Sequence, residues 1–273
     1  MPVFNEARFV DASLTSLRQQ DYPRFEILIS DNASTDDTIA ICERHAAQDD
    51  RIRIRRQTAN LGATSNFEET LSMAGGSYFM WAAGHDLWSP DFVSECVALL
   101  ERQPGACLAF GCSQWIGPDG LQLAKTSGWT DTRGMHAAGR LFTVLWGNMH
   151  PIMGLLRTAE LRACMPFKNL AGGDLVILSQ LALRGDFVHA PSAGWRRREI
   201  HHEANHAAKL RRYAQPSVAI VKSALATRFP MMQLPVELIA TVWRSNLPMR
   251  DRLGILMALI PTLPLRYVIG KRS

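Results

Sequence analysis

The chain has 273 residues, 47% of them hydrophobic, and a formal net charge of +5 at pH 7. This length and hydrophobic content suffice for a full core, which excludes a disordered chain and predicts one domain plus an appendage. The basic balance suits an anionic ligand, nucleic acid or an anionic membrane surface, without choosing among them.

The first hundred residues alternate between strand and helix patterns. Short apolar runs alternate with segments whose apolar residues recur at helical spacing. The predicted elements are a strand stub at 1–4, a helix at 9–20, a strand at 25–29, a helix ending near 48, an edge strand at 52–55 and a helix at 63–74. This order favours right-handed crossovers and an α/β, doubly wound, mostly parallel sheet of the Rossmann-like kind.

The stretch Tyr78–Pro90 is the main candidate for a site. Its apolar start predicts a buried strand, and Ser89 with Pro90 predicts the N-cap and first turn of a helix reaching about residue 103. His85 and Asp86 follow the strand, at the edge of an open sheet where ligands bind. Asp86 is therefore the leading candidate for a metal ligand.

The second half of the chain is less regular. The predicted elements are a strand at 107–112, a hairpin or mobile loop at 115–134, short helices at 136–147 and 158–164, and a strong helix opened by Ala171–Asp174 and ending at 184–185. Asp174 lies in the first turn of that last helix, where the positive end of the helix dipole favours a carboxylate.

The C-terminal region has a different character. Trp195–His202 is a dense cationic run, and residues 253–269 are largely apolar. Pro261, Pro264 and Arg266 interrupt the apolar stretch, which is too short to cross a bilayer and fits a membrane interface or packing on the domain. We expect residues 1–200 to form the main domain and residues 201–273 a basic, partly apolar helical region.

The sequence also bears on the cellular compartment and on where the first strand begins. The five cysteines form no CxxC pair, which favours reduced core thiols and a cytoplasmic setting. No secretory signal is visible, because Asn5, Glu6 and Arg8 interrupt the first apolar run. The abrupt start at Met1 suggests that part of a first strand precedes the given sequence.

Four motifs in order resemble one known family. They are Pro2–Glu6, the acidic loop Asp31–Asp36, the turn Asn60–Gly62, and His85–Asp86 four residues before Pro90. Together they resemble the family 2 glycosyltransferases with the GT-A fold, over residues 1 to about 190. The resemblance implies transfer of a sugar from a nucleotide diphosphate donor, with inversion at the anomeric carbon and usually Mg2+ or Mn2+.

The resemblance also assigns roles to residues. Asp31 would contact the base of the donor, and Pro2, Phe4 and Glu6 would wall the nucleotide pocket, with Asn60 and Gly62 nearby. The metal-binding stretch of the family is usually Asp-x-Asp, and here it reads Ala83-Gly84-His85 followed by Asp86. Asp86 and His85 are thus the implied metal ligands, since imidazole serves Mn2+ tolerably. Asp174 matches the general base.

This chemistry needs two carboxylates on separate loops. A cation held by Asp86 would neutralise the departing diphosphate, and Asp174 would take the proton of the acceptor hydroxyl. The expected partners are a nucleotide sugar and a glycan or lipid-linked acceptor in bacterial polysaccharide or glycolipid assembly, at the inner face of the plasma membrane. Nucleic-acid binding is disfavoured because the basic run lacks interleaved aromatic residues.

The same residues have plainer interpretations. Asp31 and Asp36 also suit helix caps, Asp174 a first-turn carboxylate, His85 a solvated loop and His150 a turn before proline. The arginines at 196–198, with His201 and His202, suit a diphosphate clamp or a solvated, membrane-facing surface. Trp81 and Trp88 favour packing over sugar stacking.

Two other functions compete with transfer. Without the first metal carboxylate, the domain would bind a nucleotide sugar or glycan and transfer nothing. A dinucleotide-dependent oxidoreductase is disfavoured, because no GxGxxG follows the first strand.

Overall fold

The structure, a computed structural model, describes residues 1–273 apart from 126, 129, 148–149, 171, 201–231 and 270–273. His201 and His202 therefore lie outside the described residues. The first sheet consists of β1 (Pro2–Val3), β2 (Ile27–Asp31) and β3 (Ile52–Arg56), in that order and with both pairs parallel, as predicted. Its helices are α1 (Val10–Arg18), α2 (Thr38–Ala46) and α3 (Ala63–Met73).

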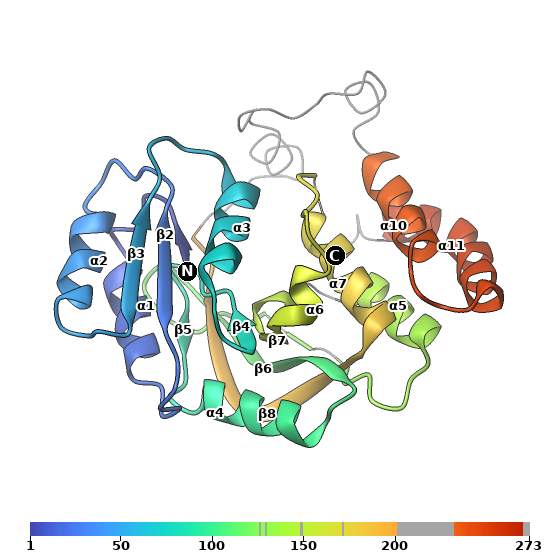
Figure 1. The fold of residues 1–273 in the computed structure, drawn as a ribbon, viewed down its shortest axis with the longest axis horizontal. Helices are drawn as coiled ribbons and strands as arrows, with labels where there is room; N and C mark the ends of the chain where they lie inside the picture. The colour runs from blue at the N-terminus through green and yellow to red at the C-terminus, as the bar shows by residue number, and fades with distance from the viewer. Residues whose placement is uncertain (126, 129, 148–149, 171, 201–231, 270–273) are drawn as a thin grey trace.

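The first sheet lies between α1 and α2 on one face and α3 on the other (Figure 1). Successive side chains of a strand point to opposite faces, so β2 contributes to two cores. Ile27 and Ile29 belong to the core that includes α1 and α2. Leu28 belongs to the core that includes Leu71 of α3. A fully apolar strand is therefore required at this position.

The second sheet is mixed, whereas a mostly parallel sheet was predicted. Its strands lie in the order β4-β7-β6-β8-β5. They are β4 (Tyr78–Met80), β5 (Leu87–Trp88), β6 (Ala106–Ile116), β7 (Leu155–Arg157) and β8 (Asp186–Arg198). Only β6 and β8 pair in parallel, because β5 and β7 run against their neighbours.

The long β6–β8 pair contains an irregularity. Gly111 is opposite Ala190, and the next residue, Cys112, is opposite Gly194. Residues 191–193 are thus extra residues on β8 with no partner in this register. Such a bulge bends a strand and redirects the side chains that follow it.

Helices cover both faces of the second sheet (Figure 1). They are α4 (Phe92–Arg102), α5 (Ala137–Trp146), α6 (Thr158–Arg162) and α7 (Gly173–Arg184), with a short 3-10 helix η1 at His150–Met153. The predicted cap of α4 is wrong by two residues: Asp91 occupies the N-cap position. The Ser89 hydroxyl instead accepts a hydrogen bond of 2.8 Å from the Gly194 amide of β8.

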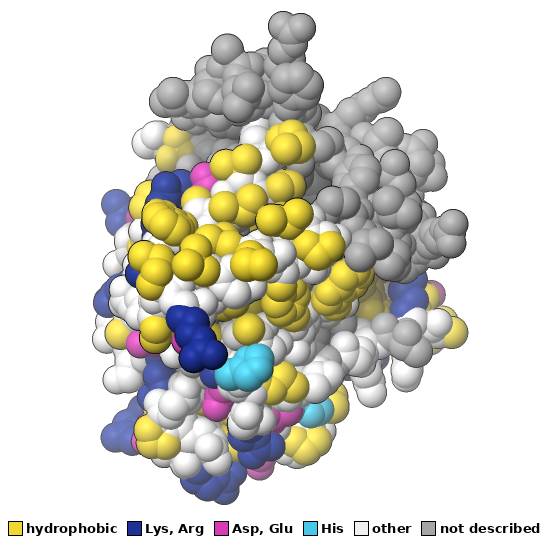
Figure 2. Space-filling model, turned by 90° about the vertical axis from the view of Figure 1, so that its right-hand side faces the viewer, with side chains coloured by type: hydrophobic (Ala, Val, Ile, Leu, Met, Phe, Trp, Pro, Cys, Tyr) yellow, Lys and Arg dark blue, Asp and Glu magenta, His cyan; other side chains and the backbone are white. Residues whose placement is uncertain are grey.

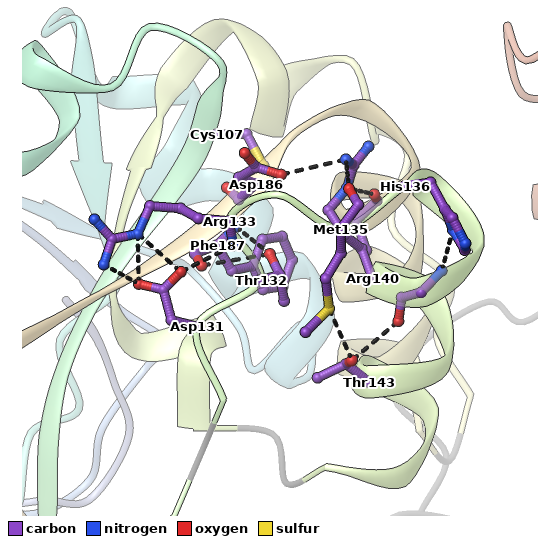
Figure 3. Close-up of polar contacts among 12 residues, drawn as sticks. Cys107, Asp131, Thr132, Arg133, Met135, His136, Arg140, Thr143, Asp186 and Phe187 are labelled. Carbon is purple, nitrogen blue, oxygen red and sulfur yellow. Dashed lines mark hydrogen bonds and ion pairs between the residues drawn. The ribbon is translucent and has the colours of Figure 1, made fainter.

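The last residues of the loop expected at 115–134 are hydrogen-bonded to the start of β8. Thr132 donates its amide to the Phe187 carbonyl at 2.9 Å, and the Phe187 amide donates back to the Thr132 hydroxyl at 2.8 Å (Figure 3). The Asp131 carboxylate accepts a bond from the His189 amide at 2.9 Å. Arg140 of α5 pairs with Asp186 at 3.2 Å. The start of β8 is thereby anchored independently of its far end.

Two helices, α10 (Gln233–Trp243) and α11 (Met249–Ile269), complete the described chain. Each buries one apolar stripe in the core shared with α7, through Leu238 and Val242 of α10 and Ile255 and Leu259 of α11. Each also exposes a second apolar stripe, and Figure 2 shows hydrophobic side chains gathered on the side of the molecule where α10 and α11 lie. No helix among the described residues has the length and hydropathy required to cross a bilayer.

All five cysteines are free thiols. Four are buried as predicted, and Cys112 on β6 is exposed. Burial raises the pKa of the Cys42 and Cys164 thiols to about 12, so these groups stay protonated and unreactive at neutral pH.

Candidate active site

The loops that follow β1 and β2 are joined by side-chain hydrogen bonds. The Glu6 amide donates to the Thr38 hydroxyl at 2.7 Å, and the Ala7 amide donates to the Asp36 carboxylate at 3.1 Å. Asn5 has a φ of 53°, a left-handed conformation that asparagine tolerates, and its side-chain oxygen accepts the Thr35 amide at 2.8 Å. The sheet edge at these loops is therefore rigid before any ligand binds.

Asp31 and Asp36 have different local roles. Asp31 is 1% exposed, and each of its carboxylate oxygens accepts the Ser34 amide at 3.2 Å. Since α2 begins only at Thr38, Asp31 orders the loop and does not cap the helix. Asp36 accepts the Thr38 amide at 3.0 Å, and this bond with others lowers the pKa of its carboxyl, although burial opposes the shift. The contact of Asp31 with a donor base stays a prediction.

The Asn60–Gly62 turn is held by Asn32, a residue that sequence reasoning did not select. The Asn32 amide group donates to the Asn60 side-chain oxygen at 2.8 Å, and its own oxygen accepts the Leu61 amide at 2.9 Å. Gly62 has a φ of 87°, which favours glycine at the start of α3. The turn therefore lies beside the end of β2, on the side of the sheet edge where the nucleotide pocket was predicted.

The predicted pocket walls Pro2 and Phe4 differ in exposure. Pro2 is half-buried in β1, and the Phe4 side chain is 42% exposed just after that strand. An exposed aromatic ring at a sheet edge is available for stacking on a flat ligand. The role of both residues in binding stays a prediction.

His85 lies against Glu6, which connects the two sheets. The His85 Nδ1 atom is 2.9 Å from Glu6 Oε1. Burial lowers the pKa of His85, but the hydrogen bond to Glu6 and the negative charges of Asp86 and Glu6 outweigh it, so the histidine pKa is raised. A Cβ atom added at Gly84 would lie only 3.0 Å from Glu6 Cγ and 3.2 Å from Val3 Cγ1. Glycine at position 84 thus permits the close approach of Glu6, and His85 is not simply a solvated loop residue.

Asp86 is 2% exposed and is bonded to the far end of β8. Its Oδ2 atom accepts the Trp195 indole N–H at 3.0 Å, and Oδ1 accepts the Arg198 amide at 2.8 Å. Burial raises the pKa of Asp86, opposed by His85 and by these two donors. The carboxylate holds β8 against β5, whatever else it binds.

Asp174 lies at the start of α7, after Gly172 with a φ of 90°. Its side chain is exposed to solvent, yet enough protein surrounds it for desolvation to raise the carboxyl pKa. The charge of Arg197 opposes that rise, and Arg197 acts in the same direction on Asp86. The two carboxylates singled out by the sequence therefore lie within Coulombic reach of one guanidinium, although 88 positions separate them in the numbering.

The remaining candidates are mostly structural. Trp81 is 1% exposed and packs on Phe67, Phe79 and Phe167, and Trp88 is also buried. His150 in η1 is buried with its ring 5.5 Å from that of Trp195, and burial together with Arg197 lowers its pKa to about 4. A neutral imidazole is expected there at physiological pH.

The residues implied as metal ligands do not make a complete site within the described chain. No group of three His, Cys, Asp or Glu side chains with suitable placement occurs among the described residues. Asp86 already accepts two hydrogen bonds, and His85 Nε2 lies 3.9 Å from Asp86 Oδ1. These two side chains alone give fewer ligands than a protein metal centre usually has.

Comparison with known proteins adds a family assignment. The sequence model described as glycosyl transferase family 2 matches residues 1–159. EpsE of Bacillus subtilis, a putative glycosyltransferase, is 33% identical over 103 residues, which cover 37% of each protein. TuaG of the same organism, a putative teichuronic acid biosynthesis glycosyltransferase, is 29% identical over 124 residues, covering 45% of this chain and 49% of TuaG. The chain thus matches less than half the length of these relatives.

Solved structures share the fold. S. aureus TarS in complex with UDP-GlcNAc has a TM-score of 0.69 and 17% identity, and the match covers 95% of this chain and 70% of that chain. The mannosyltransferase PcManGT from Pyrobaculum calidifontis, in complex with GDP-Man and Mn2+, has a TM-score of 0.57 and 17% identity, with coverages of 97% and 73%. These likenesses confirm the α/β GT-A fold class.

Proposed function

Because this chain belongs to glycosyl transferase family 2, we propose that it transfers a sugar from a nucleoside diphosphate donor to a hydroxyl acceptor, with inversion of the anomeric carbon. The observation that carries the proposal is the family match over residues 1–159, and it is supported by an exposed carboxylate, Asp174, in the first turn of α7. A carboxylate that is accessible but poorly solvated suits a general base.

The donor is proposed to bind across the loops after β1 and β2. Phe4 and Pro2 would flank the base, Asp31 would face it, and the Asn60–Gly62 turn would close the pocket. Glu6 and His85 would then lie where the pocket meets the second sheet, since they contact each other at 2.9 Å. This arrangement would direct the diphosphate toward the end of β8.

The transfer itself needs one bond formed and one broken. The acceptor oxygen attacks the anomeric carbon from the face opposite the diphosphate, and its proton passes to the Asp174 carboxylate. The bond between the anomeric carbon and the diphosphate oxygen breaks, and its electron pair leaves on the nucleoside diphosphate. A carboxylate at hydrogen-bond distance from the hydroxyl typically contributes roughly 10²- to 10⁴-fold to such a step.

The predicted Mg2+ or Mn2+ stays a prediction. The solved structure of PcManGT holds Mn2+ with its donor. In this chain Asp86 and His85 would be its ligands, and a bound ion would supply positive charge to the diphosphate. Among the described residues, no group of three suitable ligand side chains accompanies them.

A screen of nucleotide sugars tests the proposal. Thermal unfolding would be followed with UDP-, GDP-, TDP- and CMP-linked sugars, each with EDTA or with Mn2+, because a ligand that binds the folded state raises the melting temperature. We expect one donor class to raise it. The proposal fails if none does under either condition.

A matched pair of variants separates transfer from simple binding. The Asp174→Asn variant should keep the shift produced by the donor and lose transfer to acceptor. If wild type and Asp174→Asn both bind the donor and neither releases nucleoside diphosphate with any hydroxyl acceptor, the chain is a binding module.

We further propose that the exposed stripes of α10 and α11 dock on an anionic membrane surface. They comprise Met232 at the N-cap of α10, Val236, Ile239 and Trp243 of α10, and Met249, Leu253, Met257 and Ile260 of α11, all at least 44% exposed. Exposed Arg244 and Arg250 lie beside them in the sequence, and large apolar patches bordered by basic residues suit lipid headgroups. Such docking would place the chain at the inner face of the plasma membrane, near lipid-linked acceptors of bacterial polysaccharide or glycolipid assembly.

Vesicle sedimentation tests the docking surface. The chain should sediment with phosphatidylglycerol vesicles and less with phosphatidylcholine vesicles. Met257→Glu together with Ile260→Glu should abolish sedimentation, whereas Leu121→Glu, an equally exposed apolar position outside the stripes, should not. Equal sedimentation of all three proteins, or dimerisation through the stripes in solution without vesicle binding, would overturn the proposal.

A further inference from the structure

The three consecutive arginines at the end of β8 do not share one role. Side chains alternate between the two faces of a strand, so Arg196 and Arg198 lie on the face opposite Arg197. Arg198 is 9% exposed and donates to the carbonyls of His85 and Gly117, each at 3.0 Å. Arg196 donates to the Gly120 carbonyl at 3.1 Å. These two arginines brace the turn that follows β6.

Arg197 is held by aromatic side chains. Its register partner on β6 is Trp115, and the guanidinium carbon lies 4.3 Å from the centre of that ring. The Trp195 ring, on the same face of β8, is 5.7 Å away. Stacking of a guanidinium on an aromatic face fixes its plane while its N–H groups point outward in that plane.

Four titratable groups from three parts of the chain lie within Coulombic reach of this guanidinium. Its charge acts on His85 and Asp86 before β5, on His150 of η1 and on Asp174 of α7. Among the described residues, Arg197 is the charged side chain that acts on Asp174. Trp195, whose ring lies 5.7 Å from the Arg197 guanidinium, donates its indole N–H to Asp86 at 3.0 Å, so Arg197 also lies close to the predicted metal ligand.

We propose that Arg197, stacked on Trp115 and close to the hydrogen bond between Trp195 and Asp86, binds the diphosphate of the donor and stabilises the negative charge that develops on it as it leaves. This inference rests on the proposed transfer reaction and names a further residue for it. A planar guanidinium binds phosphate oxygens through paired, charge-assisted hydrogen bonds. The role does not depend on whether a divalent ion also binds.

The position also fits the direction of the reaction. The leaving oxygen gains charge while the proton moves to Asp174, so a fixed cation near both stabilises the transition state more than the ground state. Arg198, on the opposite face of β8, also lies near Asp86, but its guanidinium already donates to the carbonyls of His85 and Gly117. The three arginines look equivalent in the sequence, and only the alternation of side chains along β8 separates Arg197 from Arg196 and Arg198.

The test compares Arg197→Gln with Arg196→Gln, which removes the same charge from the adjacent position on the opposite face. Binding of UDP and GDP, and of uridine and guanosine as ligands without phosphate, would be measured by calorimetry in EDTA and in Mn2+. We expect Arg197→Gln to weaken diphosphate binding by roughly 10- to 100-fold, the usual loss when a partner of a charged group is removed, and to leave nucleoside binding unchanged. Arg196→Gln should bind both like wild type.

A second variant covers the case in which Arg197→Gln folds poorly. Arg197→Lys keeps the charge but not the planar stack on Trp115, so its diphosphate affinity should lie between those of wild type and Arg197→Gln. The inference is overturned if both variants bind the wild type's preferred diphosphate as wild type does. If wild type itself binds neither UDP nor GDP, the proposed function fails instead, so the two failures are distinguishable.

Discussion

Replacing Asp86 by asparagine tests whether its carboxylate is a structural anchor. Both carboxylate oxygens accept buried N–H groups, from Trp195 at 3.0 Å and from Arg198 at 2.8 Å. Asparagine has one acceptor, so its amide group would face one of these two donors. A hydrogen bond to a charged group contributes about 1.5–3 kcal/mol, and an unsatisfied buried donor costs about 1–3 kcal/mol.

The net loss of unfolding free energy should be smaller than the sum of these two costs. A neutral amide costs less to bury than a carboxylate, and burial already raises the pKa of Asp86. We expect Asp86→Asn to lose about 2–4 kcal/mol of unfolding free energy. For a chain of this size that lowers the melting temperature by roughly 5–15 °C, with or without EDTA. Circular dichroism at increasing temperature measures it.

Two comparisons sharpen this experiment. Trp195→Phe removes only the indole donor and should lower stability by a smaller amount, about 1–3 kcal/mol. Arg196→Gln loses only an exposed hydrogen bond to Gly120 and should lower stability by at most about 1 kcal/mol. If Asp86→Asn melts like wild type but loses Mn2+-dependent donor binding, the carboxylate is a metal ligand and its role as an anchor is wrong.

Four other outcomes follow from the structure. Asp174→Asn should lower turnover by about 10²- to 10⁴-fold with donor affinity unchanged in calorimetry. Burial raises the pKa of Asp174, so turnover should fall as pH drops through that raised value. Arg197→Gln removes the charge that opposes this rise and should move the acid limb of the pH–rate profile to higher pH. An unmoved limb would contradict the role of Asp174 as general base. Gly84→Ala should cost about 1–3 kcal/mol in a melting experiment, since its Cβ would meet Glu6 at 3.0 Å; an unchanged melting curve would show that Glu6 moves aside freely. Brief treatment of the native protein with N-ethylmaleimide should label Cys112 and leave the four buried thiols unmodified in peptide mass spectrometry; labelling at Cys42 would show that this core opens.

Much of the fold could be predicted from local patterns. The first sheet and its helices follow from apolar periodicity, and the observed bounds differ from the expected ones by a few residues. By contrast, β5 (Leu87–Trp88) was missed because two residues carry no periodic signal, and they form a strand only by pairing with Trp195 and Arg196. The Ser89 cap failed for a similar reason, since its partner Gly194 is distant in sequence.

The candidate site shows the same division. Local chemistry was enough to select His85, Asp86 and Asp174, whose functional roles stay predictions. The hydrogen-bond partners of Asp86 lie 109 and 112 positions further along the chain, and no local pattern indicates them. The sequence left the cationic run open between a diphosphate clamp and a solvated or membrane-facing surface, and only its place in β8 distinguishes Arg197 from its neighbours.

The unpaired residues at 191–193 on β8 determine which arginine faces the carboxylates. A deletion there that the bulge absorbs would leave the pairing of Arg197 with Trp115 intact, whereas a deletion that shifts the downstream pairing by one residue would turn Arg197 outward and bring Arg196 and Arg198 inward. The composition and net charge of the chain would then be nearly unchanged, while different guanidinium groups would lie on the side of Asp86 and Asp174. Parity at a single irregular stretch of backbone is thus as decisive for this site as the identity of any side chain in it.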